Sequence, residues 1–259
     1  MIMRYPGGKS KLISEIGKFL DPLLIECDIY TEPFVGGGSV ALHAAKKNDG
    51  MILHLNDLDS GISSFWKTVV DGDLDSLFKL MRRHPSVRLF KELRDSTPVD
   101  VVDKAYKALF LNRCAFSGIS TSGPIGGYDQ KSEWKIGCRY NYVRLKKEIE
   151  EAHELLRDRT VVTGIDFRKV MNNDGLYYVD APYYTKGDQL YPVKMLHKDH
   201  VVLMYILQGN DNWVASYDQC KEIRELYSWA KIIPIKAGYS INGIKKSWKR
   251  SKECIIIPK

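Results

Sequence analysis

Short apolar runs alternate with amphipathic helical patterns at both ends of this 259-residue chain. The runs expected to form strands are Ile29–Phe34, Met51–Leu55, Thr160–Thr163, Leu176–Val179, Asn212–Ser216, Lys231–Ile235 and Cys254–Ile257. The helices expected between many of them are Lys9–Leu20, Ser39–Lys47, His197–Leu207 and Cys220–Tyr227. Because helices and strands take turns, the sequence predicts an α/β fold with a mostly parallel sheet.

The alternation stops between residues 61 and 159, where helical patterns dominate. The clearest of these helices are Phe90–Asp95, Val101–Leu111 and Tyr142–Leu156. Residues 117–137 are rich in Gly, Ser and Thr with some alternating stretches, which predicts a loop or a hairpin. We therefore expect an α/β core of residues 1–60 and 160–259, interrupted by a helical insert with the size of an independent domain.

Composition narrows the partners and the compartment. A net charge of +7 favours an acidic partner, nucleic acid first, although ordinary surface lysines would give the same total. The five cysteines form no CxxC pair, which predicts small apolar side chains in a reducing compartment and no metal site. Because no run has the length or composition of a signal peptide or a membrane span, we expect a soluble, cytoplasmic protein.

A glycine turn follows the first expected strand and precedes a helix start. Gly36 and Gly38 belong to a Gly-Gly-Gly triplet, where small residues let the backbone approach a ligand closely. About twenty residues further on, Asp57 ends the next strand, at the spacing of an acid that holds ribose hydroxyls. This pairing predicts a nucleoside-like ligand. The alternative is an ordinary turn with a capping aspartate.

The segment Gly8-Lys9-Ser10 resembles the end of a phosphate-binding loop. A true loop of that kind needs another glycine five residues before Gly8, where Met3 stands, and a preceding strand. Lys9 is more consistent with a cation that neutralises a carboxylate, such as that of a methionine moiety. A helix start with a solvated lysine is the alternative.

The tetrapeptide Asp180-Ala181-Pro182-Tyr183 follows an apolar strand and is the most specific motif. An exocyclic base amine is a poor nucleophile, because its lone pair is delocalised into the ring. The Asp180 carboxylate and the Ala181 carbonyl can accept its two N–H bonds, and Pro182 keeps Ala181 extended. Tyr183 offers a face on which the base stacks. With the glycine turn, this suggests methyl transfer from S-adenosylmethionine to a base amine; a capped strand-end turn is the alternative.

Two weaker signals complete the pattern. Asp166-Phe167 follows another expected strand, and its acid and ring suit an adenine amine and an adenine face, although Asp166 could equally cap a turn. The stretch from Lys245 to Lys252 is basic with one aromatic residue, which suits phosphate contacts or a solvated loop.

The motifs follow one another along the chain as Tyr5-x-Gly-Gly-Lys9, Glu32-x-Phe-x-Gly-Gly-Gly38, Asn56-Asp57, a helical insert, Asp166-Phe167 and Asp180-Ala-Pro-Tyr183. In this order they resemble those of the Dam-type (D12 class) DNA adenine-N6 methyltransferases over almost the whole chain. The resemblance implies a class I S-adenosylmethionine-dependent methyltransferase fold, duplex DNA with a flipped adenine, and a target-recognition insert. Residues implied to line the cofactor are Tyr5, Gly8, Lys9, Phe34, Gly36, Gly38, Asp57, Asp166, Phe167 and Asp180. Asp180 to Tyr183 would hold the adenine.

The chain departs from the family pattern at two positions. Ala181 replaces the usual first proline of Asp-Pro-Pro-Tyr, which keeps the carbonyl but loses one ring constraint. Thr121 stands near the place of an arginine in GATC-reading members, so GATC specificity is not implied. The residues expected to contact DNA are Arg113, Ser117, Thr121, Lys131, Lys135, Arg139, Lys245, Lys246, Lys249 and Arg250.

Three alternatives to a DNA adenine methyltransferase stay open at this stage. One is a non-catalytic, DNA-binding or cofactor-sensing homologue in which Ala181 is the lesion. The others are methyltransferases that act on RNA or on a modified base. A cognate restriction nuclease or a phage setting would be consistent with the resemblance.

Overall fold

The structure is a computed structural model that describes residues 1–4, 8–172, 175–185, 195–237 and 251–259. Within these residues, seven strands form one sheet in the order β3-β2-β1-β4-β5-β7-β6. Neighbours from β3 to β5 run parallel, whereas β7 lies antiparallel between β5 and β6. The expected Rossmann-like α/β core is confirmed, with an antiparallel edge that the alternation of elements did not reveal.

All seven expected strands form. Their bounds are β1 Ile29–Glu32, β2 Ile52–Asn56, β3 Thr160–Thr163, β4 Leu176–Val179, β5 Trp213–Asp218, β6 Lys231–Ala237 and β7 Ser251–Ile257. The first strand ends at Glu32 rather than Phe34, because the glycine turn already begins after Pro33. The last strand starts earlier than expected, since β7 pairs with β6 along its full length, from Lys231 opposite Ile257 to Ala237 opposite Ser251.

Alternate residues of the central strands separate two hydrophobic layers. Along β4, Leu176 and Tyr178 face one layer, and Tyr177 and Val179 face the other. The first layer holds the helices α1 (Ile13–Leu24) and α2 (Ser39–Lys47), preceded by the 3-10 turn η1 (Lys9–Lys11). The second layer holds α8 (Phe167–Val170), α10 (His197–Gln208) and α11 (Lys221–Leu226). Both faces of the parallel strands are therefore covered.

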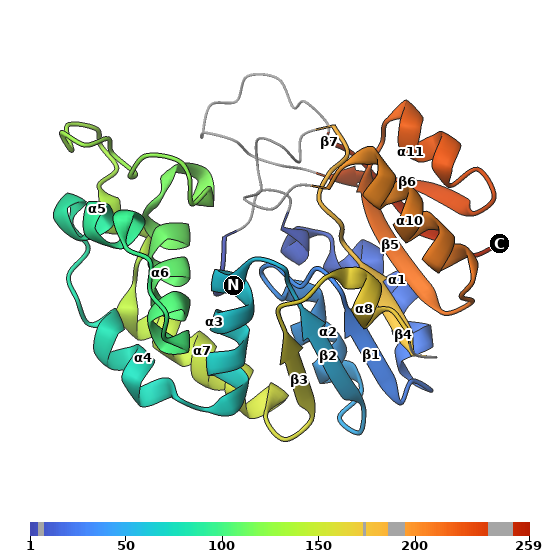
Figure 1. Ribbon diagram of the computed structural model, residues 1–259, viewed down its shortest axis with the longest axis horizontal. Helices are drawn as coiled ribbons and strands as arrows, with labels where there is room; N and C mark the ends of the chain where they lie inside the picture. Colours follow the sequence, from blue (N-terminus) through green and yellow to red (C-terminus); the bar gives the residue numbers. More distant parts are fainter. Residues whose placement is uncertain (5–7, 173–174, 186–194, 238–250) are drawn as a thin grey trace.

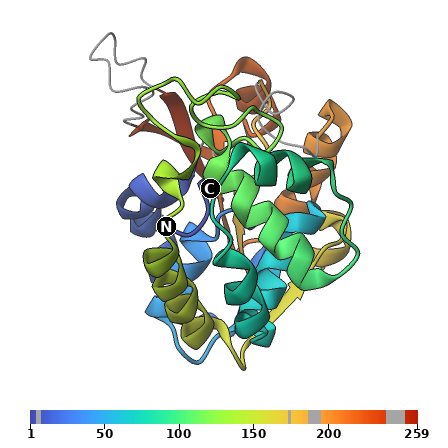
Figure 2. The ribbon, with the colours of Figure 1, turned by 90° about the vertical axis from the view of Figure 1, so that its left-hand side faces the viewer.

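Residues 60–156 supply the helices of the insert beside the β3 edge of the sheet (Figures 1 and 2). They are α3 Ser60–Asp71, α4 Leu74–Met81, α5 Val87–Asp95, α6 Val101–Cys114 and α7 Tyr142–Leu156. Asp59, Asp100 and Asn141 cap α3, α6 and α7 with side-chain oxygens that accept backbone N–H groups. α3 packs against both β3 and α6, and the buried side chains of the sheet and the insert form one continuous cluster.

The stretch from residue 117 to 137 is a loop and not a hairpin. It carries the 3-10 turn η2 (Phe116–Gly118) and runs into η3 (Ile136–Arg139), and its one β-bridge among the described residues joins Ala115 to Pro124. Gly118, Gly126 and Gly127 adopt positive φ angles. Such positions interrupt an extended ladder, so the glycines of this stretch favour a folded loop over two paired strands.

The sheet topology fixes where a ligand can bind. The order of strands reverses between β1 and β4, and ligands of open α/β sheets bind outside the carboxyl ends of the strands at such a point. The glycine turn, Asp57 and Asp180 follow β1, β2 and β4 directly. Motifs that are far apart in the sequence therefore meet at the carboxyl ends of the inner strands β1, β2 and β4.

Candidate active site

The glycine turn after β1 is shaped by a tryptophan of the insert. Gly38 has a φ angle of +64°, and a Cβ added there would lie 2.2 Å from Cζ2 of Trp66 in α3. The Trp66 indole N–H donates to the carbonyl of Gly36 at 2.9 Å. Gly36 itself has a φ angle of +46° with open space where a side chain would be. The turn therefore needs glycine at Gly38 for packing and leaves room for a ligand beside Gly36.

Asp57 stands at the end of β2 and ties the turn to the next loop. Its carboxylate accepts the backbone N–H of Gly36 at 2.9 Å and that of Asp59 at 3.0 Å. Burial raises the pKa of Asp57 to about 7, which those backbone hydrogen bonds only partly oppose. A carboxylate held in this way still has lone pairs for further donors, such as the two hydroxyls of a ribose.

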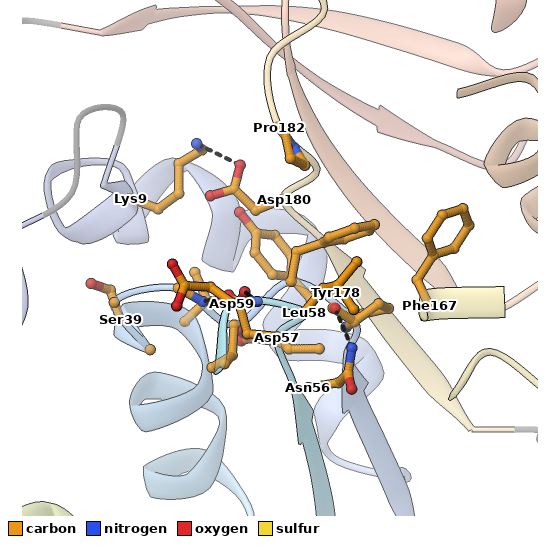
Figure 3. Close-up of a pocket in the computed structure, with 18 of the residues that line it drawn as sticks. Lys9, Ser39, Asn56, Asp57, Leu58, Asp59, Phe167, Tyr178, Asp180 and Pro182 are labelled. Carbon is orange, nitrogen blue, oxygen red and sulfur yellow. Dashed lines mark hydrogen bonds and ion pairs between the residues drawn. The ribbon is translucent and has the colours of Figure 1, made fainter. Parts of the chain in front are cut away.

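Lys9 and Asp180 form a buried ion pair at the carboxyl ends of the strands (Figure 3). The Lys9 ammonium lies 2.6 Å from Oδ1 of Asp180, and only 3% of the Lys9 side chain is exposed. Ser216 of β5 donates to the same oxygen at 3.0 Å and is itself linked to the Tyr178 hydroxyl. The Asp180 side chain keeps 26% of its surface exposed. Burial raises the pKa of Asp180 despite the neighbouring Lys9.

The aromatic end of the tetrapeptide is held on two sides. The Tyr183 hydroxyl donates to Oε1 of Glu253 on β7 at 2.5 Å, and Lys9 Nζ lies 3.4 Å from that hydroxyl and 5.1 Å from the ring centroid. Ala181 is buried against the second hydrophobic layer, and Pro182 lines the pocket. The tetrapeptide thus connects the end of β4 with Lys9 of the N-terminal segment and with Glu253 of β7.

Phe34 and Phe167 form an apolar wall on the opposite side. Their ring centroids lie 5.4 Å apart, and both line the pocket. Asp166 caps α8 by accepting the N–H of Arg168, and the Arg168 guanidinium lies over the Phe167 ring at 4.8 Å. The same guanidinium bridges Asp166 and Asp199 of α10. Asp166 therefore lies at the pocket as expected, but with Arg168 already bound to its carboxylate.

These groups surround one pocket of about 250 Å³. Of the predicted cofactor residues, all that the structure describes line it; they are Gly8, Lys9, Phe34, Gly36, Gly38, Asp57, Asp166, Phe167 and Asp180. Tyr5 lies outside the described residues. Figure 3 shows Asp57 and Asp59 at one end of the pocket and Lys9 with Asp180 at the other. The pocket therefore joins a carboxylate suited to a ribose with Asp180 and Pro182 of the tetrapeptide, whereas Ala181 and Tyr183 are buried and are not among its lining residues.

Sequence reasoning missed several residues of this pocket. Leu58 and Ile165 add apolar surface, and Glu32 adds a buried carboxyl that accepts the Tyr30 hydroxyl at 2.5 Å. Burial raises the pKa of Glu32 well above its ordinary value. Asn56 connects the loops after β1 and β3 through its amide, which donates to the carbonyls of Pro33 and Ile165. Glu32 stands four residues before Gly36, and Asn56 directly precedes Asp57, so both residues stood beside predicted site residues, but the sequence suggested no chemistry for either.

The expected DNA contacts divide into three groups. Ser117, Thr121, Lys131, Lys135 and Arg139 are exposed in the insert, as a DNA contact requires. Lys245, Lys246, Lys249 and Arg250 lie outside the described residues. Arg113 is 3% exposed, and its guanidinium donates to the carbonyl of Met1. Assigning Arg113 to a phosphate was wrong, because a side chain so buried has no surface left for DNA.

The insert loop also carries aromatic side chains that sequence reasoning left out. Trp134 and Phe116 are more than half exposed. The Arg139 guanidinium lies 5.5 Å from the Trp134 ring, and Lys91 of α5 lies 5.4 Å from the ring of the exposed Tyr128. Large aromatic residues in a loop rich in Gly and Ser were the available signal.

The insert also positions the N-terminal segment that carries Lys9. Asn112, near the end of α6, accepts the backbone N–H of Arg4 at 2.6 Å and donates to its carbonyl at 2.7 Å. A Cβ on Gly118 would lie 2.4 Å from that same carbonyl, so glycine is needed for this close approach.

Comparison with known proteins agrees with this geometry. Residues 5–241 match the family model described as D12 class N6 adenine-specific DNA methyltransferase. The chain belongs to this D12 class. It is 24% identical over 187 residues to the type II methyltransferase M.CviBI of Paramecium bursaria Chlorella virus NC1A. It is also 24% identical over 204 residues to the type II methyltransferase M.MjaIII of Methanocaldococcus jannaschii. Each match covers 70% of this chain and 68% of the relative.

Membership of the D12 class identifies the sheet and its helices as the class I methyltransferase fold. Among the described residues, no three His, Cys, Asp or Glu side chains are grouped as metal ligands. Within the same ranges, no helix combines the length and the apolar character needed to cross a membrane.

Proposed function

We propose that this D12-class protein transfers a methyl group from S-adenosylmethionine to the exocyclic amine of an adenine in DNA. The observation that carries the proposal is a single pocket lined by Gly36 and Asp57 and also by Asp180, whose Oδ1 is held by Lys9 and Ser216. The retained Lys9–Asp180 pair favours an enzyme over a cofactor-sensing homologue, because such a homologue has no need of a buried charge pair at this place.

The residues present fit S-adenosylmethionine. Gly36 leaves open space at the edge of the pocket, Asp57 offers acceptor lone pairs for the ribose, and Phe34 and Phe167 offer apolar faces for the adenine ring. Asp166 accepts the adenine amine in this proposal, which requires Arg168 to share its carboxylate or to lean towards Asp199. When bound, S-adenosylmethionine supplies an electrophilic methyl group attached to a positively charged sulfur.

The tetrapeptide prepares the target amine. Asp180 Oδ2 and the Ala181 carbonyl accept the two N–H bonds, which draws the nitrogen towards tetrahedral geometry and frees its lone pair. Bound S-adenosylmethionine would supply the methyl group to this nitrogen, its sulfur would keep the electron pair of the broken methyl–sulfur bond, and the released amine proton would pass to solvent by way of the acceptors that hold the N–H bonds. Lys9 and Ser216 keep Asp180 oriented through Oδ1, so the other oxygen points to the base.

The base reaches this site only outside the duplex stack, so the proposal includes a flipped adenine. Tyr183 supplies the stacking face. Ser117, Thr121, Lys131, Lys135 and Arg139 of the insert contact the DNA in this proposal, with the aromatic rings of Trp134 and Phe116 beside them. The relatives are type II methyltransferases, which supports a restriction-modification setting with a cognate nuclease, or a phage genome, for this chain.

One experiment tests the reaction class. The protein is incubated with methyl-labelled S-adenosylmethionine and mixed genomic DNA, and modified bases are mapped at single-nucleotide resolution. We expect label at N6 of adenine, in DNA and not in an RNA control. Label on cytosine, or only on RNA, would contradict the proposal.

The role of Asp180 is tested by Asp180→Ala, with the exposed Asp211→Ala as the matched control. We expect Asp180→Ala to abolish transfer while cofactor binding by calorimetry stays within about tenfold, or about 1.4 kcal/mol. Asp211→Ala should behave as the wild type. Near-normal turnover of a folded Asp180→Ala protein would show that the assigned chemistry is wrong.

A further inference from the structure

Glu253 is a buried carboxylate that the assigned chemistry does not use. It lies on β7, opposite Asp218 of β5, and is 1% exposed. Glutamate is rarely buried to this degree unless a partner compensates it. Gln219 of the loop after β5 donates to the Glu253 backbone carbonyl at 2.8 Å, which fixes this part of the strand.

The Glu253 side chain accepts a hydrogen bond from the tyrosine of the tetrapeptide. Oε1 of Glu253 accepts the Tyr183 hydroxyl at 2.5 Å, and a hydrogen bond to an ionised acceptor is about twice as strong as a neutral one. The ring of Tyr183 is almost fully buried, and Lys9 lies against its face. The hydroxyl end and one face of the ring are therefore held by two charged groups from distant parts of the chain.

We propose that Glu253 is a positioning residue, which holds the Tyr183 ring at the angle at which the target adenine stacks. The inference rests on the proposed function. Glu253 is not among the residues that line the pocket, and in this proposal it acts through the Tyr183 hydroxyl. In this proposal β7, through Glu253 and Tyr183, helps to set the orientation of the target adenine.

A carboxylate at this place has an electrostatic cost for the site. Besides burial, the charge of Glu253 raises the pKa of Asp180, which has to be ionised to accept the amine strongly. A glutamine would accept the same hydroxyl without this repulsion. Comparing Glu with Gln at this position therefore separates two effects of the residue, which are the hydrogen bond that it accepts from Tyr183 and the charge that it places near Asp180.

The test compares Glu253→Ala, Glu253→Gln and Tyr183→Phe with the wild type and with Glu225→Ala, which removes an exposed carboxylate from α11. Turnover is measured on a duplex that contains the mapped target adenine, and cofactor affinity is measured by calorimetry. We expect Glu253→Ala and Tyr183→Phe each to lower kcat about ten- to a hundredfold, with the KM for S-adenosylmethionine within about threefold. Glu253→Gln should keep kcat within about threefold of the wild type, and Glu225→Ala should equal it.

The double variant Tyr183→Phe/Glu253→Ala should be no slower than Tyr183→Phe alone, because both changes remove one hydrogen bond. Wild-type kcat in Glu253→Ala, equal losses in Glu253→Gln and Glu253→Ala, or additive losses in the double variant would each overturn the inference. If Glu253→Ala does not fold, an active Glu253→Gln beside an impaired Tyr183→Phe still supports it, and the reverse result overturns it. A wild type that methylates no adenine would overturn the proposed function instead.

Discussion

Removing the cation of the Lys9–Asp180 pair by Lys9→Met should lower the free energy of unfolding, by an amount that depends on pH. Deleting one member of a fully buried ion pair costs about 3–5 kcal/mol, because the other charge is left without compensation. Asp180 keeps 26% of its side chain exposed, so water screens part of that charge and about 2–3 kcal/mol is expected. Lys11→Met, on the same 3-10 turn but exposed, is the matched control and should change stability by less than about 0.5 kcal/mol.

The sign of the pH effect follows from the raised pKa of Asp180. Between the unfolded pKa of about 3.9 and the higher folded value, the native state binds more protons, so stability falls as pH rises. Without Lys9 the folded pKa rises further, and this window extends to higher pH. The deficit of Lys9→Met should therefore be largest at pH values above the raised pKa of Asp180 and should shrink on acidification, as Asp180 takes up a proton.

Urea unfolding of Lys9→Met, Asp180→Asn and the double variant, followed at several pH values, measures these quantities. Each single change should be destabilising, and the double variant should lie within about 1 kcal/mol of the wild type, since it leaves no unpaired charge. Additive single effects, or a Lys9→Met deficit that is independent of pH, would refute the argument that the two groups compensate each other.

Other predictions concern the remaining parts of the site. Gly38→Ala should cost about 2–5 kcal/mol and lower cofactor affinity, because its Cβ would overlap Trp66 at a positive φ angle; thermal unfolding and calorimetry measure both, and a stable variant contradicts it. Asp57→Ala should weaken S-adenosylmethionine by about 1.5–3 kcal/mol. Wild-type affinity should fall as pH drops below about 7, where Asp57 takes up a proton, and calorimetry that finds no pH dependence would remove Asp57 from the site. Ala181→Pro should keep single-turnover activity within about threefold, since only its carbonyl acts; complete loss in a folded protein would give its N–H a role. With Thr121 in place of a guanine-reading arginine, methylation should not be confined to GATC, and strict GATC modification of genomic DNA would contradict this.

The sequence was sufficient to predict those site residues that directly follow a recognisable strand. The glycine turn and Asp57 were paired on spacing alone, and the structure joins them by a hydrogen bond from the Gly36 N–H. The prediction succeeded because the glycine turn and Asp57 follow two neighbouring parallel strands. The carboxyl ends of such strands lie side by side, however long the chain segment between them. The tetrapeptide was found from its residue types directly after the apolar run that forms β4.

Contacts that depend on tertiary packing were beyond reach. Arg113 was assigned to DNA as a basic residue of the insert, yet α6 is buried along most of its faces and Arg113 is buried with it. Glu253 gave no signal, because a strand that pairs antiparallel between β5 and β6 cannot be recognised from the alternation of elements. The Lys9–Asp180 pair was missed because Lys9 was matched to a ligand carboxylate and not to one of the protein.

The contact between Trp66 and the glycine turn limits how the helical insert can be exchanged between proteins of the D12 class. Trp66 belongs to the first helix after β2, so a graft that replaces residues 61–159 as a cassette would remove the indole that shapes Gly36 and Gly38. A junction at Gly72, where α3 ends in a left-handed cap, would leave that indole with the recipient. Chimaeras joined after α3 should therefore keep the recipient's affinity for the methyl donor, whereas chimaeras joined before α3 should lose that affinity.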